Sequence, residues 1–328
     1  MTLFGGDGVP PGLLPLNLAR KPTPIQPLPR LSERLGVDLR VKRDDLTGLA
    51  WSGNKIRKLE YLVADALASG ADTLVTCGGA GSNHCRATAF VAARLGLGCR
   101  LILRTQDGRP PAEPWTGNLL LCRIAGAEIR WVSRSRYRDY ESCFGIQREE
   151  LLDGGRRPYL IPEGGSNRLG SQGYADCYRE LREQWPEAEV VVAAMGSGGT
   201  AAGLVLGHRE AKRGPRVVAV NVCDDASFFR QRLTAIIGDA ASEDLRILDG
   251  FKGQGYALST PEELAFVAEM AALEGLLLDP VYTGKAFKGL VETLRRDPDS
   301  MGSRVLFLHT GGVFGLFEQA AALGEVAA

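Results

Sequence analysis

Hydrophobic and polar positions follow two alternating patterns along the chain, and together they predict a parallel α/β fold. Short apolar runs typical of buried strands cover residues 73–77, 99–103, 128–132, 190–194, 216–222 and 304–308. Between these runs the apolar residues recur at helical spacing, over 55–69, 83–95, 117–124, 137–152, 200–212, 227–240, 261–274, 284–296 and from 313 onward. Strands that alternate with helices in this way pack as parallel sheets covered by helices.

Two segments interrupt the alternation and suggest a division into domains. Residues 9–30 are rich in proline, so we expect an extended lead-in that packs over a domain and ends near the amphipathic run 31–35. Residues 161–167 combine a proline with two glycines and mark the point where the chain is expected to cross from one domain to the other. We therefore predict a large domain of residues 1–52 and 164–328 and a small domain of residues 53–163. In such parallel sheets ligands bind at the carboxyl ends of strands, which predicts an active site in the interdomain cleft.

Composition narrows the classes of partner. The 328 residues contain 39 Lys and Arg and 39 Asp and Glu, so there is no net field to attract nucleic acid or an anionic membrane. No apolar stretch approaches the ~20 residues that span a bilayer, and the N-terminal residues lack the basic region of a signal peptide. The seven cysteines are odd in number and unclustered, as in reduced proteins. We expect a cytoplasmic protein.

Metal chemistry is not expected either. The chain has three histidines, and no carboxylate cluster stands near them at metal-ligand spacing. His208 and His309 are therefore not predicted to be metal ligands, and we predict no catalytic metal.

Three glycine-rich turns follow predicted strands, at residues 78–84, 196–200 and 309–312. A turn of this kind at the start of a helix presents N–H groups and the positive end of the helix dipole to an anion. The turn 196–200 lacks the spacing of a dinucleotide-binding loop and the lysine of an ATP-binding loop. It fits a single phosphate, and a tight turn needed only for packing is the alternative reading.

Two further positions carry candidate chemistry. Ser82 stands at a helix N-cap position with Asn83 and His84 in the first turn, where a carboxylate would be well received, although capping alone would also explain the serine. Lys55 follows a turn-like Ser-Gly-Asn at the head of a helix and can present its amine to a cofactor aldehyde. A Schiff-base lysine with a single-phosphate cradle suggests pyridoxal phosphate. We expect Lys42 and Arg57 to lie on solvated faces.

Five ordered motifs carry a family resemblance over nearly the whole chain. They are S-G-N-K-x-R-K-L-E-Y at 52–61, G-G-x-x-S-N-H-x-R at 78–86, G-S-G-G-T-x-A-G at 196–203, D-P-V-Y-T-G-K-A at 279–286 and H-T-G-G at 309–312. With these motifs the chain resembles the D-cysteine desulfhydrase and 1-aminocyclopropane-1-carboxylate deaminase family. That family consists of fold-type-II pyridoxal-phosphate enzymes related to tryptophan synthase β, which are typically homodimeric, so the resemblance implies this fold and assembly.

The resemblance also implies roles for individual residues. Lys55 would hold pyridoxal 5′-phosphate as a Schiff base and move the α-proton of the substrate, and Lys58 would approach the phosphate. Asn83 would bind the phenolic oxygen of the cofactor, and it would receive the substrate carboxylate together with Ser82 and His84. Tyr282 and Tyr256 would stack and handle protons, although core packing would also explain Tyr256. The phosphate would be held by Gly196, Ser197, Gly198, Gly199 and Thr200.

Two substitutions favour the desulfhydrase branch of the family. The deaminase pattern has Glu and Leu where this chain has Thr283 and Thr310, both of which would lie by the cofactor. A carboxylate beside the pyridine nitrogen would keep that nitrogen protonated, and a threonine hydroxyl does so less strongly. The resemblance then implies β-elimination from D-cysteine to pyruvate, ammonia and sulfide, with Lys55, Ser82 and Tyr282 as catalytic residues.

One departure leaves the substrate open. The family usually reads G-G-I-Q-S-N where this chain has Ala80 and Gly81 in place of the bulky pair, so the pocket could be enlarged or reshaped. A β-replacement reaction, or a lyase that acts on cysteate, another β-substituted alanine or 1-aminocyclopropane-1-carboxylate, is the second hypothesis. A non-catalytic descendant that binds an amino acid is the third.

Overall fold

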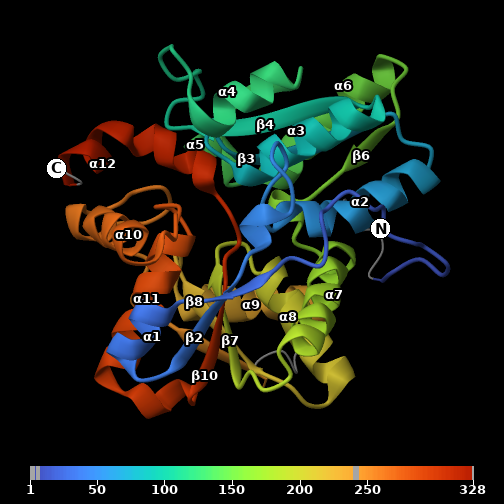
Figure 1. Ribbon diagram of the computed structural model, residues 1–328. Coiled ribbons are helices and arrows are strands. Elements are labelled where there is room, and N and C mark those ends of the chain that lie inside the picture. The colour runs from blue at the N-terminus through green and yellow to red at the C-terminus, as the bar shows by residue number, and fades with distance from the viewer. Residues whose placement is uncertain (1–3, 5–7, 239–243, 327–328) are drawn as a thin grey trace. The chain divides into compact units, whose positions relative to one another are not determined.

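The chain folds into two α/β units, each built around its own sheet (Figure 1). This computed structural model describes residue 4 and residues 8–238 and 244–326. The first unit takes the chain up to Ala19, Leu49–Trp51 and Lys55–Gly170, and the second takes Arg20–Gly48, Ser52–Asn54 and the chain from Ser171. The sequence-based boundaries and the interdomain cleft stay predictions. The units differ from those boundaries chiefly in that the N-terminal segment belongs with the first unit.

The first unit has a four-stranded sheet in which every strand pair is parallel. Its order is β5-β4-β3-β6. The strands are β3 (Thr73–Gly79), β4 (Gly98–Thr105), β5 (Glu128–Ser133) and β6 (Pro158–Leu160). The helices are α2 (Lys55–Ala68), α3 (Asn83–Leu95), α4 (Gly117–Ile124), α5 (Arg134–Tyr137) and α6 (Tyr140–Asp153), with a 3-10 turn η2 (Glu163–Gly165). β3 is central and buried along its whole length, so the loop after it starts from a fixed point.

The second unit has a six-stranded sheet of order β1-β2-β10-β7-β8-β9, in which only the pair β1 and β2 is antiparallel. The strands are β1 (Ile25–Pro27), β2 (Asp38–Lys42), β7 (Val190–Met195), β8 (Arg216–Asn221), β9 (Leu245–Leu248) and β10 (Arg304–Leu308). The α-helices are α1 (Pro29–Leu35), α7 (Arg168–Gln184), α8 (Gly199–Ala211), α9 (Ala226–Ile237), α10 (Pro261–Glu274), α11 (Thr283–Arg296) and α12 (Ala320–Val326). The 3-10 helices are η1 (Asp44–Leu46), η4 (Pro298–Met301) and η5 (Val313–Gln319).

Alternate residues of β7 face opposite layers of helices in the second unit. Val190 and Val192 pack with Phe287 of α11 in one apolar cluster. Val191 and Ala193 pack with Leu204 of α8 in the other. Because both faces of the sheet are covered, the central strands β7, β8 and β10 are nearly continuous apolar runs, and these three were predicted. α8 lies very close to α7, since a Cβ on Gly203 would come within 2.2 Å of the Ser171 carbonyl oxygen.

The predicted parallel α/β architecture is confirmed, and three expectations about helices need correction. The helix expected over 137–152 is two helices, because Asp139 caps a new one by accepting a hydrogen bond from the Ser142 N–H. The helix expected from Val313 begins as η5 and becomes an α-helix at Ala320. The last two positions of the helix expected near 227–240 lie outside the described residues. The long helix α7 and the strands β1, β2, β6 and β9 were not predicted.

Lys42 and Arg57 are buried, so the prediction that they lie on solvated faces is wrong. The Arg57 side chain is 1% exposed because α2 is covered on nearly every side. Lys42 is fully buried, and its Nζ donates to the Thr23 carbonyl at 2.7 Å, to Gln184 and to Glu180. Of the helices in residues 8–238 and 244–326, none is long and apolar enough to cross a bilayer.

Candidate active site

The predicted site residues form one cluster in each unit. The first-unit cluster consists of Lys55, Lys58, Ser82, Asn83 and His84. The second-unit cluster consists of the loop 196–200 with Tyr256, Tyr282, Thr283 and Thr310. The chain itself links the two, because Asn54 belongs to the second unit and Lys55, the next residue, begins α2 in the first.

Two lysines lie at the head of α2. Lys55 occupies its first position and is half-buried, as expected for an amine that must reach a ligand. Lys58, one turn later, is fully buried, and its Nζ donates to the Gly164 carbonyl at 3.2 Å and to the Ser166 hydroxyl at 3.3 Å. Burial lowers the pKa of Lys58 well below its usual value, and the charge of Lys55 lowers it further. The expected approach of Lys58 to a phosphate stays a prediction.

The N-terminus of α3 presents backbone donors that could receive an anionic group. Ser82 is the N-cap, and its Oγ accepts a hydrogen bond from the Cys85 N–H at 3.2 Å. A Cβ on Gly78 would come within 2.6 Å of the Ser82 Oγ, so the turn after β3 requires glycine there. The N–H groups of Asn83 and His84 open the helix and have no carbonyl within it to receive them. Together with the helix dipole they favour a negatively charged ligand group.

Two buried acceptor atoms at this helix end lack a hydrogen-bond partner. In the described part of the chain, neither the Asn83 Oδ1 nor the His84 Nδ1 has one. The His84 side chain is 2% exposed, and its Nε2 lies 2.9 Å from the Thr76 hydroxyl. Burial lowers the pKa of His84 well below 6.5, and the charges of Lys55 and Lys58 lower it further. His84 is therefore neutral, and an unpaired buried acceptor of this kind is costly unless a ligand completes it.

The loop 196–200 opens α8 in the second-unit cluster. Gly198 is the N-cap with φ of 85°, a left-handed conformation that favours glycine. A Cβ on Gly196 would come within 2.6 Å of the Tyr282 ring, so the loop lies directly against that ring. The Thr200 hydroxyl accepts a hydrogen bond from the Asn54 Nδ2 at 3.0 Å and can still donate its own proton. The leading N–H groups of α8 and this hydroxyl could together hold a phosphate, which stays a prediction.

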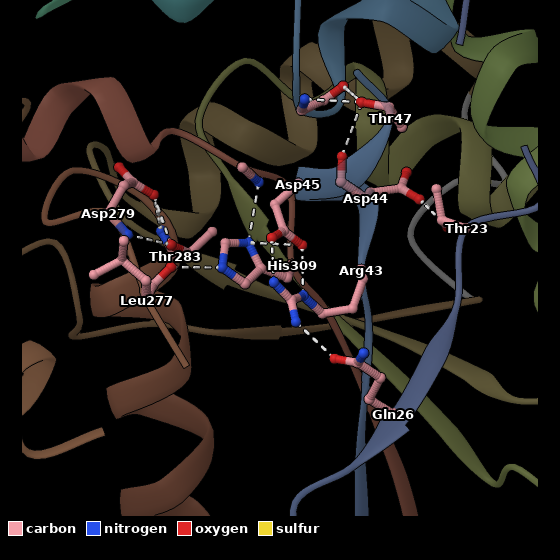
Figure 2. A network of polar contacts seen from close by, with 12 residues as sticks. Thr23, Gln26, Arg43, Asp44, Asp45, Thr47, Leu277, Asp279, Thr283 and His309 are labelled. Atoms are coloured by element: carbon pink, nitrogen blue, oxygen red, sulfur yellow. Dashed lines mark hydrogen bonds and ion pairs between the residues drawn. The ribbon is translucent and has the colours of Figure 1, made fainter. Parts of the chain in front are cut away.

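The Asp279 carboxylate accepts four hydrogen bonds and supports the motif 279–286. This role was not predicted from the sequence. Its Oδ1 accepts the Thr283 N–H and the Thr283 hydroxyl, both at 2.7 Å, and its Oδ2 accepts the N–H groups of Val281 at 3.0 Å and Tyr282 at 2.9 Å. The Asp279 N–H donates back to the Thr283 Oγ1 at 2.8 Å, as Figure 2 shows. Burial raises the pKa of the Asp279 carboxyl, and these hydrogen bonds oppose the rise. The sequence feature that could have indicated this role is the aspartate that precedes the proline in the motif.

The turn 309–312 packs onto both neighbouring motifs of the second unit. The His309 Nδ1 accepts the Gly311 N–H at 3.1 Å, so its Nε2 carries the proton and donates to the Leu277 carbonyl at 2.9 Å (Figure 2). The Asn54 N–H donates to the Thr310 carbonyl at 2.9 Å, and a Cβ on Gly53 would come within 2.7 Å of that oxygen. The segments 52–54, 279–283 and 309–312 therefore form one tightly packed frame.

The other histidine considered for metal binding is also engaged in structure. The His208 Nδ1 lies 2.8 Å from the Tyr178 hydroxyl, and that hydroxyl donates to the Pro215 carbonyl at 2.9 Å. Among the residues that the structure describes, no group of three or more His, Cys, Asp or Glu could hold a metal ion. The prediction of no catalytic metal stays a prediction.

Tyr256 and Tyr282 lie edge to face, with ring centroids 6.0 Å apart. Burial raises the pKa of Tyr282 well above 10, and Tyr256 raises it further. The segment that carries Tyr256 is held by Lys285, a residue that the sequence analysis did not single out. The Lys285 Nζ donates to the carbonyls of Lys252 at 2.9 Å, Gly255 at 3.0 Å and Leu258 at 2.7 Å, which uses all three of its protons.

Comparison with known proteins identifies the class of cofactor. The family model described as pyridoxal-phosphate dependent enzyme matches residues 16–311. The chain belongs to this family. As a pyridoxal-phosphate-dependent enzyme it needs a lysine amine for the cofactor aldehyde and an anion cradle for the phosphate, and Lys55 and the loop 196–200 fit these needs. The unpartnered acceptors of Asn83 and His84 also fit a site that a ligand completes.

The relatives of this pyridoxal-phosphate-dependent enzyme carry two activities in their names. A bifunctional D-cysteine desulfhydrase/1-aminocyclopropane-1-carboxylate deaminase of Arabidopsis thaliana is 42% identical over 92% of this chain and 79% of its own. A D-cysteine desulfhydrase of Salmonella choleraesuis is 40% identical over 92% of this chain and 95% of its own. A solved structure of an ACC deaminase homologue matches with a TM-score of 0.87 and 37% identity, over 96% of this chain and 97% of that one. The fold-type-II architecture is confirmed by this match.

Proposed function

We propose that this enzyme is a lyase that eliminates sulfide from D-cysteine and releases pyruvate and ammonia. The observation that supports the proposal concerns residue 283. Thr283 stands where the deaminase motif carries glutamate, and its hydroxyl proton is donated to Asp279. Residue 283 therefore offers neither a negative charge nor a proton, which favours loss of a good leaving group over chemistry that needs a strongly charged partner.

Each cluster then has a distinct task. When bound, pyridoxal 5′-phosphate supplies an electron sink that eases removal of the α-proton. Lys55 would hold the cofactor and take that proton, and the helix end at Ser82 and Asn83 would bind the substrate carboxylate. Gly196, Ser197, Gly198, Gly199 and Thr200 would hold the phosphate, which Lys58 is expected to approach. Tyr256, Tyr282, Thr283 and Thr310 would line the cofactor site and exclude water.

A direct assay tests the proposal. The enzyme supplied with pyridoxal 5′-phosphate should release sulfide and pyruvate in equal amounts from D-cysteine. Lys55→Ala should abolish the release because no other amine stands at the head of α2 facing solvent, whereas Lys288→Ala, at a surface position of α11, should leave it unchanged. If the enzyme releases neither sulfide nor pyruvate from either enantiomer of cysteine, the proposal is refuted.

A second candidate is a lyase or β-replacement enzyme for another amino acid. It is favoured by the turn after β3, where Ala80 packs against the cluster around Cys85 and the Gly81 carbonyl accepts a hydrogen bond from Asn118 at 3.0 Å. The side chains of Ala80 and Gly81 are smaller than the pair that the family usually carries, which could reshape a substrate pocket here. A keto-acid assay over cysteate, other β-substituted alanines and 1-aminocyclopropane-1-carboxylate decides between the two candidates, since D-cysteine should remain the best substrate if the first is right.

We also propose a cytoplasmic homodimer, by analogy with the family. A retention volume of a monomer in size-exclusion chromatography would contradict the assembly. A protein that stays colourless with added pyridoxal 5′-phosphate would instead favour a non-catalytic amino-acid binder.

A further inference from the structure

One buried hydroxyl in the second unit holds the turn that precedes Lys55. The Thr47 side chain is fully buried, and its Oγ1 accepts the Gly53 N–H at 2.9 Å. The one proton of this hydroxyl lies between the carbonyl oxygens of Gly53 at 3.1 Å and Asp44 at 3.0 Å (Figure 2). A single side chain therefore contacts both the N–H and the carbonyl of Gly53.

Thr47 is itself attached to a fixed part of the second unit. It follows η1, whose first residue, Asp44, is fully buried. The Asp44 Oδ1 accepts the Thr23 hydroxyl and its Oδ2 accepts the Tyr174 hydroxyl of α7, both at 2.7 Å. The Thr47 carbonyl accepts the Arg20 N–H at 2.9 Å. The hydroxyl is therefore anchored to α7 and to the segment that precedes β1.

The turn 52–54 is also restricted on its other sides. Gly53 has φ of 99°, and a Cβ there would come within 2.7 Å of the Thr310 carbonyl oxygen. That oxygen accepts the Asn54 N–H at 2.9 Å, and the Asn54 Nδ2 donates to the Thr200 hydroxyl at 3.0 Å. Lys55 follows Asn54 directly, so the main chain enters α2 from a turn whose backbone is fully held.

We propose that Thr47 is a positioning residue for Lys55. Its hydroxyl fixes the turn 52–54, and the turn fixes the main chain from which the Lys55 amine extends. An amine that is held in place reacts with an aldehyde more favourably than one that must first lose its freedom of motion. In this role Thr47 acts through the main chain rather than on the reacting atoms. The proposal rests on the proposed function only in taking Lys55 as the amine that bonds to the cofactor.

Two ligands that differ at one carbon test the proposal on the full chain freed of cofactor. Pyridoxal 5′-phosphate carries the aldehyde that bonds to a lysine, and pyridoxine 5′-phosphate carries an alcohol that cannot. Equilibrium dialysis gives the ratio of the two affinities, in which a general loss of structure cancels. Thr47→Val removes the hydroxyl at nearly constant volume and should lower the preference for the aldehyde about tenfold, the equivalent of one hydrogen bond. A preference that is unchanged or increased in Thr47→Val would overturn the proposal.

Three matched variants complete the comparison. Thr47→Ser keeps the hydroxyl and should keep the preference, and a serine variant impaired as much as the valine variant would overturn the proposal. Thr293→Val removes a hydroxyl that donates to the Gly289 carbonyl within α11, and it should change nothing. Lys55→Ala should abolish the preference, and a preference that persists would overturn the role of Lys55 together with this proposal. Failure to release sulfide from D-cysteine would refute the proposed function alone.

Hydrogen exchange of the natural holoenzyme gives a measurement that needs no variant. The Gly53 N–H donates to a buried hydroxyl, so it should exchange with solvent far more slowly than an exposed amide. Mass spectrometry of peptides that end on either side of Gly53 measures this rate. Rapid exchange would show that Thr47 does not hold the turn and would overturn the proposal, even if Thr47→Val fails to fold.

Discussion

The two clusters differ in how completely the polar groups at or beside them are paired. Beside the second-unit cluster Asp279 accepts four hydrogen bonds, the His309 ring uses both nitrogens and Lys285 uses all three protons. In the first unit the buried Asn83 Oδ1 and His84 Nδ1 have no partner among the described residues. Complete pairing makes a rigid frame, and incomplete pairing costs free energy that a ligand can recover. The completeness of hydrogen bonding therefore distinguishes a rigid structural frame from a surface that is suited to bind a ligand.

The largest expected effect is at Asp279. Asp279→Ala leaves the N–H groups of Val281, Tyr282 and Thr283 and the Thr283 hydroxyl without an acceptor, which should lower the free energy of unfolding by about 4 kcal/mol. Urea unfolding measures it. Thr283→Val removes one of these groups and should cost clearly less, and equal losses would contradict the picture of a carboxylate with four partners.

Lys285 should come next. Lys285→Met removes the donor shared by three carbonyls of the segment 252–258, at a cost of about 3 kcal/mol. The segment should then be cut rapidly in limited proteolysis, whereas Lys288→Met, three residues further along α11, should leave the digestion pattern unchanged. If residues 252–258 resist proteolysis in Lys285→Met, other contacts hold the segment.

Lys58 should show a pH dependence, because it is a buried lysine in the incompletely paired cluster. Its pKa is lowered well below 10.5, so the unfolded chain keeps a proton that the folded chain binds weakly. Stability of the natural protein should therefore rise with pH toward 10.5, by about 1.4 kcal/mol per pH unit where only the unfolded side chain is protonated. Lys58→Met should lack this rise. Denaturant unfolding at pH 7 to 10 measures it, and a constant difference would contradict the shift.

The smallest expected effect concerns two helix N-caps. One of them should also bind the substrate, and the other should only stabilise its helix. Ser82 caps α3, and Thr260 caps α10 through a reciprocal pair with Glu263. Replacement of either by alanine should cost about 1 kcal/mol of stability. Only Ser82→Ala should also raise KM for D-cysteine, since Thr260 caps a helix outside both clusters. A matching rise in Thr260→Ala would remove the distinction.

Local rules predicted much of the site from the sequence. Ser82 as a cap, the glycine turns and the position of Lys55 at the head of a helix follow from neighbouring residues alone. Lys42 could not be placed, because its partners Glu180 and Gln184 lie on α7, far along the chain and in a helix that was not predicted. The signal for that helix was present, since Tyr174, Cys177, Tyr178 and Leu181 recur at helical spacing and are fully buried.

The state of His84 was equally out of reach. Its proton depends on Thr76 of β3 and on the Ile161 carbonyl, which lies 85 positions after Thr76. No local pattern links these groups, so the sequence could nominate the residue but not its tautomer. Contacts between distant segments decided the cases of Lys42 and His84.

The edge strand β1 has a consequence for how the protein behaves at high concentration. Open sheet edges invite pairing with other molecules, which leads to aggregation. β1 forms one edge of the six-stranded sheet and is only three residues long. It is antiparallel to its neighbour β2 and ends in Pro27, which has no backbone N–H to donate. The strand that it covers, β2, alternates charged and apolar residues, and the strands beyond β2 in the sheet, β10 and β7, are mostly apolar. This short capping strand therefore protects the protein's solubility as well as completing its fold.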